Sequence, residues 1–312
     1  MSMQFFDLHC DTIYRCEVEK EPLYDNNFHI SLKKAKQYSP WVQCFAIWIP
    51  NNVRGIKALE LFNNCLKKFN KEIEDNSKFM LKCTSNIDFQ KVLQTGKNGA
   101  ILTIEGGAAL NGDVNNLYYF KECGVRIITL TWNGSCEIGD GSNVLNSKGI
   151  TVFGKEVIKK MDELNIIIDI SHASDRLFYD VIELINKPFI ATHSNSRTIC
   201  NHKRNLTDEQ FKIIRDFDGL VGVNLCKNFL RLSGEADFSD IDKHIDHFLS
   251  LGGENIISMG CDFDGADVPY DVKGIESIEL IYEYLLKKNY SESILKKIFF
   301  DNAYNFFNTN ML

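Results

Sequence analysis

Three of the seven histidines and four carboxylates in this sequence follow short apolar runs, and their side chains are those of metal ligands. His9 and Asp11 close the run QFFDLHCD, and Glu105 closes GAILTIE, with two glycines after it. The remaining candidates close later runs in the same way, and they are His172, His193, Asp262 and Asp264. Imidazole and carboxylate together suit zinc, manganese or cobalt. The set therefore predicts a metal centre, provided that the fold brings these residues together.

Each of these residues has an ordinary structural explanation when it is taken alone. A single histidine at a strand end is often a hydrogen-bonded core or loop residue, and a single Asp there often caps the next helix. Asp264 is the candidate for which such a structural role is favoured. The joint pattern favours a metal, because burying this much charge without one would be very costly.

Eight apolar runs carry these residues, and each run is rich in β-branched or aromatic side chains. Near-continuous apolar runs are typical of parallel strands covered on both faces. Helix-length segments lie between most of them, and eight alternations of strand and helix predict an α/β fold, the closed (β/α)8 TIM barrel. The runs are residues 4–11, 42–50, 99–107, 125–132, 165–172, 188–195, 219–226 and 255–265. Because barrel active sites lie at the carboxyl ends of the strands, the candidate ligands should meet at one mouth.

The segments between the runs are amphipathic. We expect helices over residues 55–71, 154–164, 175–185, 207–217, 240–251 and 275–288. Ser174, Thr207 and Ser239 are plausible caps for three of them. Additional material over residues 13–41 and 51–98 includes a candidate helix at 88–95, and the tail at 292–307 also has a helical pattern. No linker or repeat interrupts the chain, which predicts one domain over residues 1–312.

Composition and charge narrow the function classes. The net charge of −7 offers no basic face for nucleic acid, so we expect no nucleic-acid partner. Ten cysteines occur without a C-x-x-C pair, which argues against a zinc ribbon or a thioredoxin-like site. The start, MSMQFFDLHCD, lacks the pattern of a signal peptide, and no apolar stretch approaches the roughly 18 residues needed to span a bilayer. We therefore expect a cytoplasmic protein with reduced cysteines and no membrane contact.

Six segments occur in a specific order along almost the whole chain: DLHCDT, TIEGG, IDISHAS, THSNSR, CNHKRNLTD and GCDFDG. In order and spacing they resemble the membrane dipeptidase (renal dipeptidase) family of the amidohydrolase superfamily, peptidase family M19. The resemblance implies two divalent ions, with Zn²⁺ as the expected metal. His9 and Asp11 would bind one ion and His172 and His193 the other, with Glu105 bridging both.

The same resemblance implies a reaction, in which a metal-bridging hydroxide attacks the amide bond of a small dipeptide. Asp262 would take the proton of the bridging water and pass it on, and it would also contact the substrate. Arg204 would bind the terminal carboxylate of the substrate. The family often carries a histidine after the fourth strand, where this sequence has Trp132. The next residue, Asn133, could donate a hydrogen bond to the substrate instead.

Other functions remain open at this point. The same metal centre could serve an N-acyl amino acid deacylase, a lactonase or a phosphoesterase, although Arg204 favours a substrate with a free carboxylate. A catalytically silent barrel used for binding is a further alternative, which the loss of a ligand would support. We expect a small dipeptide-like molecule as the partner, and a homodimer as the candidate assembly.

Overall fold

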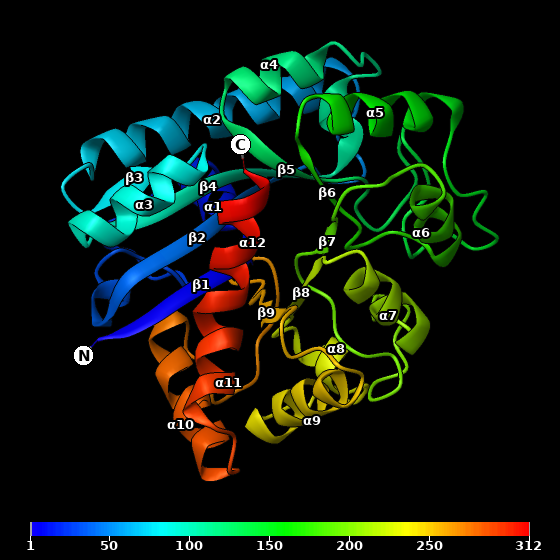
Figure 1. Ribbon diagram of the computed structural model, residues 1–312. Helices are drawn as coiled ribbons and strands as arrows, with labels where there is room; N and C mark the ends of the chain where they lie inside the picture. Colours follow the sequence, from blue (N-terminus) through cyan, green and yellow to red (C-terminus); the bar gives the residue numbers. More distant parts are fainter. Residues whose placement is uncertain (1, 312) are drawn as a thin grey trace.

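Eight parallel strands pair side by side around a closed barrel, in the computed structural model that describes residues 2–311 (Figure 1). The order β2-β1-β9-β8-β7-β6-β5-β4 is closed by pairing of β2 with β4. The barrel strands are β1 (Met3–Cys10), β2 (Tyr38–Trp48), β4 (Asn98–Glu105), β5 (Val125–Thr129), β6 (Ile167–Asp169), β7 (Ile190–Ala191), β8 (Leu220–Val223) and β9 (Ile257–Met259). The (β/α)8 TIM barrel predicted from the alternating pattern is confirmed.

Helices surround the barrel and follow the predicted segments closely. They are α1 (Thr12–Glu19), α2 (Ile56–Asp75), α3 (Asn86–Thr95), α4 (Asn116–Glu122), α5 (Val152–Glu163), α6 (Asp175–Ile182), α7 (Asp208–Asp216), α8 (Lys227–Leu230), α9 (Phe238–Ser250), α10 (Ile278–Lys287), α11 (Glu292–Lys296) and α12 (Asn302–Asn310). Short 3-10 turns cover Lys34–Gln37, Gly107–Leu110 and Ile275–Ser277, and a π-helical turn at Lys297–Asp301 joins α11 to α12. The predicted helical tail is therefore continuous, with one widened turn.

Two of the three predicted helix caps are correct. The Ser174 hydroxyl accepts from the Leu177 amide, and Thr207 forms a reciprocal capping box with Gln210. The prediction of Ser239 as a cap is wrong, because α9 begins at Phe238. Asp237 caps that helix instead, and its carboxylate accepts from the Ser239 amide and hydroxyl.

Four helices and strands lie in segments for which the sequence predicted no regular structure, namely β3, α1, α4 and α8. A short ninth strand, β3 (Met80–Lys82), pairs with the beginning of β4 inside the long insertion between β2 and β4. Helix α1 begins just after β1, α4 comes after the 3-10 turn that follows β4, and α8 lies between β8 and α9. Of these, α1 lies next to a predicted site residue, because it starts immediately after Asp11.

The C-terminal helix closes one end of the barrel. Apolar side chains of the barrel interior, among them Phe6 and Ile127, form one cluster with Phe307 of α12. The rings of Phe6 and Phe307 are stacked, with centroids 5.2 Å apart. In Figure 1, α12 crosses in front of the strands. Because this end is filled by packed side chains, access to the barrel is confined to the carboxyl ends of the strands.

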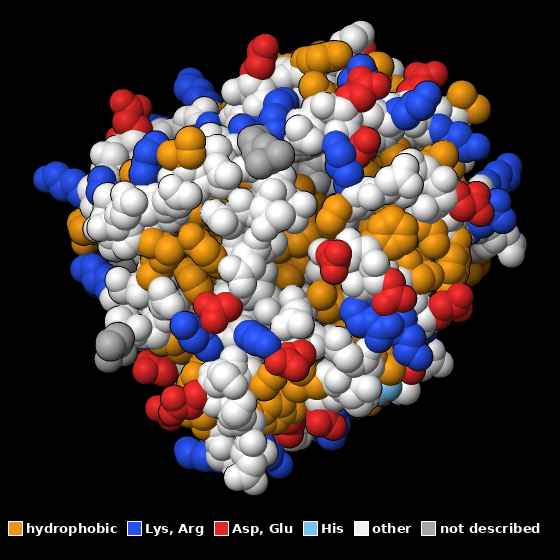
Figure 2. Space-filling model, in the orientation of Figure 1, with side chains coloured by type: hydrophobic (Ala, Val, Ile, Leu, Met, Phe, Trp, Pro, Cys, Tyr) orange, Lys and Arg blue, Asp and Glu red, His pale blue; other side chains and the backbone are white. Residues whose placement is uncertain are grey.

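The face seen in Figure 2 carries lysine and arginine side chains interspersed with aspartate and glutamate. All ten cysteines are free thiols, and eight of them are buried. Among residues 2–311, no helix combines the length and apolar character needed to cross a bilayer.

Candidate active site

The predicted ligands do converge at the carboxyl end of the barrel, but most lie on the turns that follow the strands. Glu105 is the last residue of β4, and His9 is the penultimate residue of β1. His172, His193 and Asp262 lie beyond the ends of β6, β7 and β9. Asp11 also lies beyond its strand, at the start of α1. Several predicted strands were therefore too long, because the backbone leaves the sheet before it reaches Asp11, His172, His193 and Asp262.

One carboxylate oxygen of Glu105 lies between three histidine side chains. Its Oε1 atom is 2.7 Å from His172 Nε2, 3.3 Å from His193 Nε2 and 3.8 Å from His9 Nε2. All four side chains are buried. This central position is the one that a bridging carboxylate requires.

A second group of carboxylates surrounds His9. Its Nε2 atom is 3.5 Å from Asp11 Oδ2 and 3.9 Å from Asp262 Oδ1. Two overlapping sets could therefore hold a cation, namely His9 with Glu105 and His193, and His9 with Asp11 and Asp262. In the first set His9 and His193 share Glu105, whereas the resemblance would divide them between two ions.

The donor set fits a metal ion. His9 Nε2 and Asp11 Oδ1 are buried and have no hydrogen-bond partner among the described residues. A buried polar atom without a partner costs about 1–3 kcal/mol. Imidazole nitrogen and carboxylate oxygen are also the atoms that bind zinc-like cations. A cation at this place would satisfy atoms that the protein leaves unpaired.

The pKa shifts show how strongly these groups interact. Burial would lower the pKa of His9, but Glu105 and Asp11 outweigh it and raise that pKa to about 10. Burial lowers the pKa values of His172 and His193 well below the usual range. In the metal-free protein, His9 would thus be protonated and carry the positive charge that faces the carboxylates. The other two imidazoles are kept neutral, which is the form that binds metal.

Unusual backbone supports this arrangement. His172, Asp262 and Asp264 have positive φ angles of 68°, 59° and 69°. Non-glycine residues adopt this region uncommonly, and such strain is often found at functional sites. Gly265 follows, and a Cβ atom there would come within 2.0 Å of Asp11 Oδ2. Only glycine leaves room for that carboxylate.

Asp264 serves the loops around the site. Its carboxylate is buried, and it accepts hydrogen bonds from the Thr12 hydroxyl at 2.5 Å and from the His29 amide at 2.7 Å. Arg15 Nη1 lies 3.4 Å away. These contacts join α1 and the β1–β2 loop to the turn after β9. The structural role favoured for Asp264 from the sequence matches this geometry, whereas the part played by His29 and Arg15 was missed.

Arg204 lies beside the candidate metal ligands and is 5% exposed. Its Nη2 atom donates to the backbone carbonyl of His193 at 3.3 Å, while Nε has no partner among the described residues. The guanidinium also lies over the ring of Phe229, 5.3 Å from its centroid. Arg204 therefore uses one N–H group on the turn that holds His193, and its Nε–H has no partner among the described residues.

Asn133 and Trp132 contact the site differently. Asn133 Oδ1 lies 2.8 Å from His172 Nδ1, so its carbonyl oxygen orients a predicted metal ligand. The Trp132 ring packs edge-on against Trp48, with centroids 4.9 Å apart, and lies 6.2 Å from the ring of His172. Trp132 thus forms a wall beside the candidate metal centre.

Asn224 is a site residue that the sequence analysis missed. Its Nδ2 atom donates to Asp262 Oδ2 at 3.0 Å and lies 3.3 Å from the carbonyl of His193. Its position within the apolar run GLVGVNLC was the available signal, because a polar side chain in a buried strand must have a partner.

A cavity of about 650 Å³ opens above these residues. It is lined by Asp11, Glu105, His172 and Asp262 on the side of the ligands, and by Tyr14, Trp48 and Trp132 on an aromatic side. Its volume is in the range typical of small-molecule sites. The cavity is therefore large enough to hold a small organic molecule.

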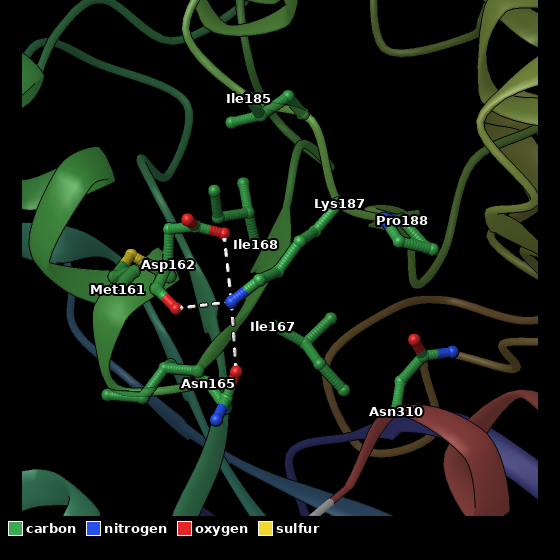
Figure 3. Close-up of a pocket in the computed structure, with 10 residues that line it drawn as sticks. Met161, Asp162, Asn165, Ile167, Ile168, Ile185, Lys187, Pro188 and Asn310 are labelled. Atoms are coloured by element: carbon green, nitrogen blue, oxygen red, sulfur yellow. Dashed lines mark hydrogen bonds and ion pairs between the residues drawn. The ribbon is translucent and has the colours of Figure 1, made fainter.

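A smaller hollow lies near the opposite ends of β6 and β7 (Figure 3). Lys187 points into it and donates to the Asp162 carbonyl at 2.7 Å and to Asn165 Oδ1 at 2.9 Å. The hollow measures about 40 Å³ and lacks a group of metal-ligating side chains among its lining residues. It fits a role in stability rather than chemistry.

Comparison with known proteins agrees with the geometry. The sequence profile of a family described as membrane dipeptidase (peptidase family M19) matches residues 1–310. This chain belongs to the membrane dipeptidase family. The family consists of metallopeptidases that act on dipeptides, so membership implies use of a divalent metal.

Individual relatives are more distant. A protein encoded in the pqqA 5′ region of Klebsiella pneumoniae is 32% identical over 230 residues, which is 70% of this chain and 85% of the relative. Mouse dipeptidase 3 is 30% identical over 211 residues, and the match spans 65% of this chain but 43% of that protein. A metallopeptidase from Rhodobacter sphaeroides, liganded with a phosphinate mimic of the dipeptide L-Ala-D-Ala, has the same fold, with a TM-score of 0.93 and 23% identity over the full length of both chains.

Proposed function

We propose that this chain hydrolyses the amide bond of small dipeptides, using two divalent ions, with zinc as the expected metal. The observation that carries the proposal is the position of Glu105 Oε1 within 2.7–3.8 Å of three imidazole nitrogens. The cavity of about 650 Å³ above it and membership of the dipeptidase family support the same activity.

Each ligand has a place in this proposal. His9 and Asp11 would hold one ion, His172 and His193 the other, and Glu105 would bridge them. Bound ions of this kind lower the pKa of a water molecule and polarise the carbonyl of the scissile bond. The contribution of the protein is to fix the ligands and to exclude bulk water from them.

Asp262 is the residue that we assign to proton transfer. Its carboxylate faces the ligand cluster, with Oδ1 3.9 Å from His9 Nε2, while Asn224 holds Oδ2. Burial raises the pKa of Asp262 above the ordinary value for an aspartate. A carboxylate with a raised pKa can take a proton from water and return it, and the departing amine needs that proton.

Arg204 is the residue that we assign to the terminal carboxylate of the substrate. The guanidinium is a planar fork suited to two parallel hydrogen bonds, and its Nε atom is buried without a partner among the described residues. Trp132 and the nitrogen of the Asn133 side chain would form the adjoining wall. Such a pocket favours a substrate with one free carboxylate and a small or apolar side chain.

Metal analysis followed by a substrate screen tests the proposal. We expect the purified protein to contain about two divalent ions per chain and to cleave some L,L- or L,D-dipeptides, with loss of activity on chelation and recovery on metal addition. Cleavage of N-acyl amino acids or lactones without cleavage of dipeptides would contradict the assigned substrate. Bound metal without any hydrolysis would favour a binding protein. A cytoplasmic location and a homodimer stay predictions.

A further inference from the structure

A buried carboxylate lies one layer below the metal ligands, inside the barrel. Asp169 is the last residue of β6 and is fully buried. Its Oδ1 atom accepts from the backbone amides of Ser171 and Thr192, each at 2.9 Å. Its Oδ2 atom accepts from the hydroxyls of Thr129 and Thr192, each at 2.6 Å. Both oxygens are thus saturated with donors from three neighbouring strands or their ends.

The Thr192 hydroxyl also contacts the next residue along the chain. Its Oγ1 atom lies 2.8 Å from His193 Nδ1. A hydroxyl has one proton to donate, and an ionised carboxylate can only accept. If the Thr192 hydroxyl donated to His193 instead, Thr192 Oγ1 and Asp169 Oδ2 would lie 2.6 Å apart with no proton between them. Two such oxygens repel each other. The hydroxyl must therefore donate to Asp169 and accept from His193.

We propose that Asp169 and Thr192 form a relay that fixes the tautomer of His193, with the proton on Nδ1 and the lone pair on Nε2. The inference rests on the proposed metal centre, because Nε2 is the atom that faces Glu105 at 3.3 Å. A histidine that binds metal through one nitrogen commonly donates its other N–H to a carboxylate or a carbonyl. Here a threonine hydroxyl stands between the imidazole and the carboxylate.

The backbone around Thr192 holds the relay in place. A Cβ atom at Gly222 or Gly260 would come within 2.0 Å of the Thr192 carbonyl oxygen, the distances being 1.9 Å and 1.8 Å. Only glycine at both positions lets β8 and β9 approach Thr192 this closely. The backbone of Thr192 is therefore closely enclosed by Gly222 and Gly260.

The alternative is that Asp169 merely ties the strands together, and Thr129 provides a matched control for that role. Thr129 and Thr192 are both buried, and they donate to the same oxygen at the same distance of 2.6 Å. Thr129→Val and Thr192→Val remove equivalent hydrogen bonds to Asp169. Only Thr192→Val also removes the acceptor for His193 Nδ1.

The first experiment compares the affinity for Zn²⁺ of these variants by competition with a chelator. Thr192→Val should bind the metal about 10–100-fold more weakly than the wild type. Thr129→Val should stay near the wild-type affinity, and Thr192→Ser should recover it because the hydroxyl is restored. Equal losses of metal affinity in Thr129→Val and Thr192→Val would overturn the relay and show that Asp169 only holds the strands together.

A second variant tests the direction of the hydrogen bonds and remains informative if Thr192→Val fails to fold. In Asp169→Asn, Oδ1 must still accept from two backbone amides, so the side-chain nitrogen that the substitution introduces takes the place of Oδ2. The Thr192 hydroxyl then accepts from this nitrogen and is free to donate to His193 Nδ1. We expect the imidazole proton to move to Nε2 and the metal affinity to fall as in Thr192→Val. An unchanged affinity would contradict the relay.

Nitrogen-15 NMR of the metal-free protein gives a readout that does not depend on activity. The wild type and Thr129→Val should show His193 protonated on Nδ1, whereas Asp169→Asn should shift the proton to Nε2. The same tautomer in all variants would overturn the proposal. Absence of metal binding by the wild type would instead contradict the proposed function, and the NMR comparison would still test the relay.

Discussion

The Nε2 atoms of His172 and His193 lie 2.8 Å apart, although the two residues are separated by 21 positions in the chain. Each Nδ1 atom has its own partner, Asn133 for His172 and Thr192 for His193. The two Nε2 atoms are therefore turned toward the same small space beside Glu105. Two unprotonated nitrogens at this distance repel each other unless a cation lies near them.

Removal of the central carboxylate should have the largest effect on metal content. Glu105→Gln should retain less metal after dialysis than a single alanine variant of His9, His172 or His193. The reason is that Glu105 contacts all three imidazoles, and an amide is a poorer bridge than a carboxylate. Elemental analysis of dialysed protein checks this, with a thermal melt to show that each variant is folded.

The number of ions can be tested separately. An anomalous-scattering map of crystals grown with metal should show two peaks next to Glu105. A single peak at full occupancy, with no second peak after further metal addition, would rule out the two-ion site.

Asp262→Asn should keep the metal and lose most of the activity. Groups that transfer protons typically contribute about 10²–10⁴-fold to the rate, and we expect kcat to fall in that range. Asn224 can still contact the new side chain, so the local fold should survive. Steady-state kinetics and metal analysis of the same preparation check both parts.

Asp264→Asn is the matched control for Asp262. Asp264 has the same side chain and a similar positive φ, but its carboxylate is engaged by Thr12 and His29. It should lose some stability and much less activity. If Asp262→Asn were nearly as active as the wild type while Asp264→Asn was inactive, the proton-transfer role would belong to Asp264.

The convergence of the candidate ligands could be predicted from the sequence because a parallel barrel gathers the ends of all its strands at one mouth. For His9, Glu105 and His193, the position at the end of an apolar run was enough to make each a candidate. Their local geometry could not be predicted in the same way. β6 and β7 are only three and two residues long, and His172 reaches Glu105 through a positive φ angle that no periodicity reveals.

The supporting contacts were harder to predict for a different reason. Asp169, Thr192 and Asn224 act through hydrogen bonds between strands, and their partners are far away in sequence. Helix α1 was missed because its sequence, TIYRCEVE, is too short to show a clear helical periodicity. It forms because the chain must turn back from the mouth, where Ile13 and Cys16 become buried.

Asp7 should contribute a loss of stability to the metal-free protein as the pH rises from about 4 to about 7. Burial raises the pKa of Asp7 to about 7, and its Oδ2 atom has no partner among the described residues. The folded state then binds a proton that the unfolded chain has released, so rising pH favours unfolding until Asp7 ionises. The effect is on the order of 4 kcal/mol at most.

Asp7→Asn isolates this contribution. The variant should match the wild type near pH 4 and be more stable near pH 8, as measured by denaturant unfolding of the metal-free protein. His9 also contributes to the pH dependence, but it is present in both proteins. A constant difference between the two proteins across this range would show that Asp7 has an ordinary pKa.

The last prediction concerns recognition of the substrate carboxylate by Arg204. Arg204→Ala should lower kcat/KM for dipeptides by about 10–100-fold, as expected for a lost charge-assisted contact of roughly 1.5–3 kcal/mol, while the metal content stays unchanged. The loss should be smaller for dipeptides with an amidated C-terminus, because an amide cannot accept both hydrogen bonds of the guanidinium. Arg204→Lys should recover part of the activity, since a point charge replaces the fork. Arg204 also donates to the carbonyl of His193, so a purely structural role makes a different prediction. In that case Arg204→Ala would reduce the cleavage of free and amidated substrates equally, and it would weaken metal binding as well.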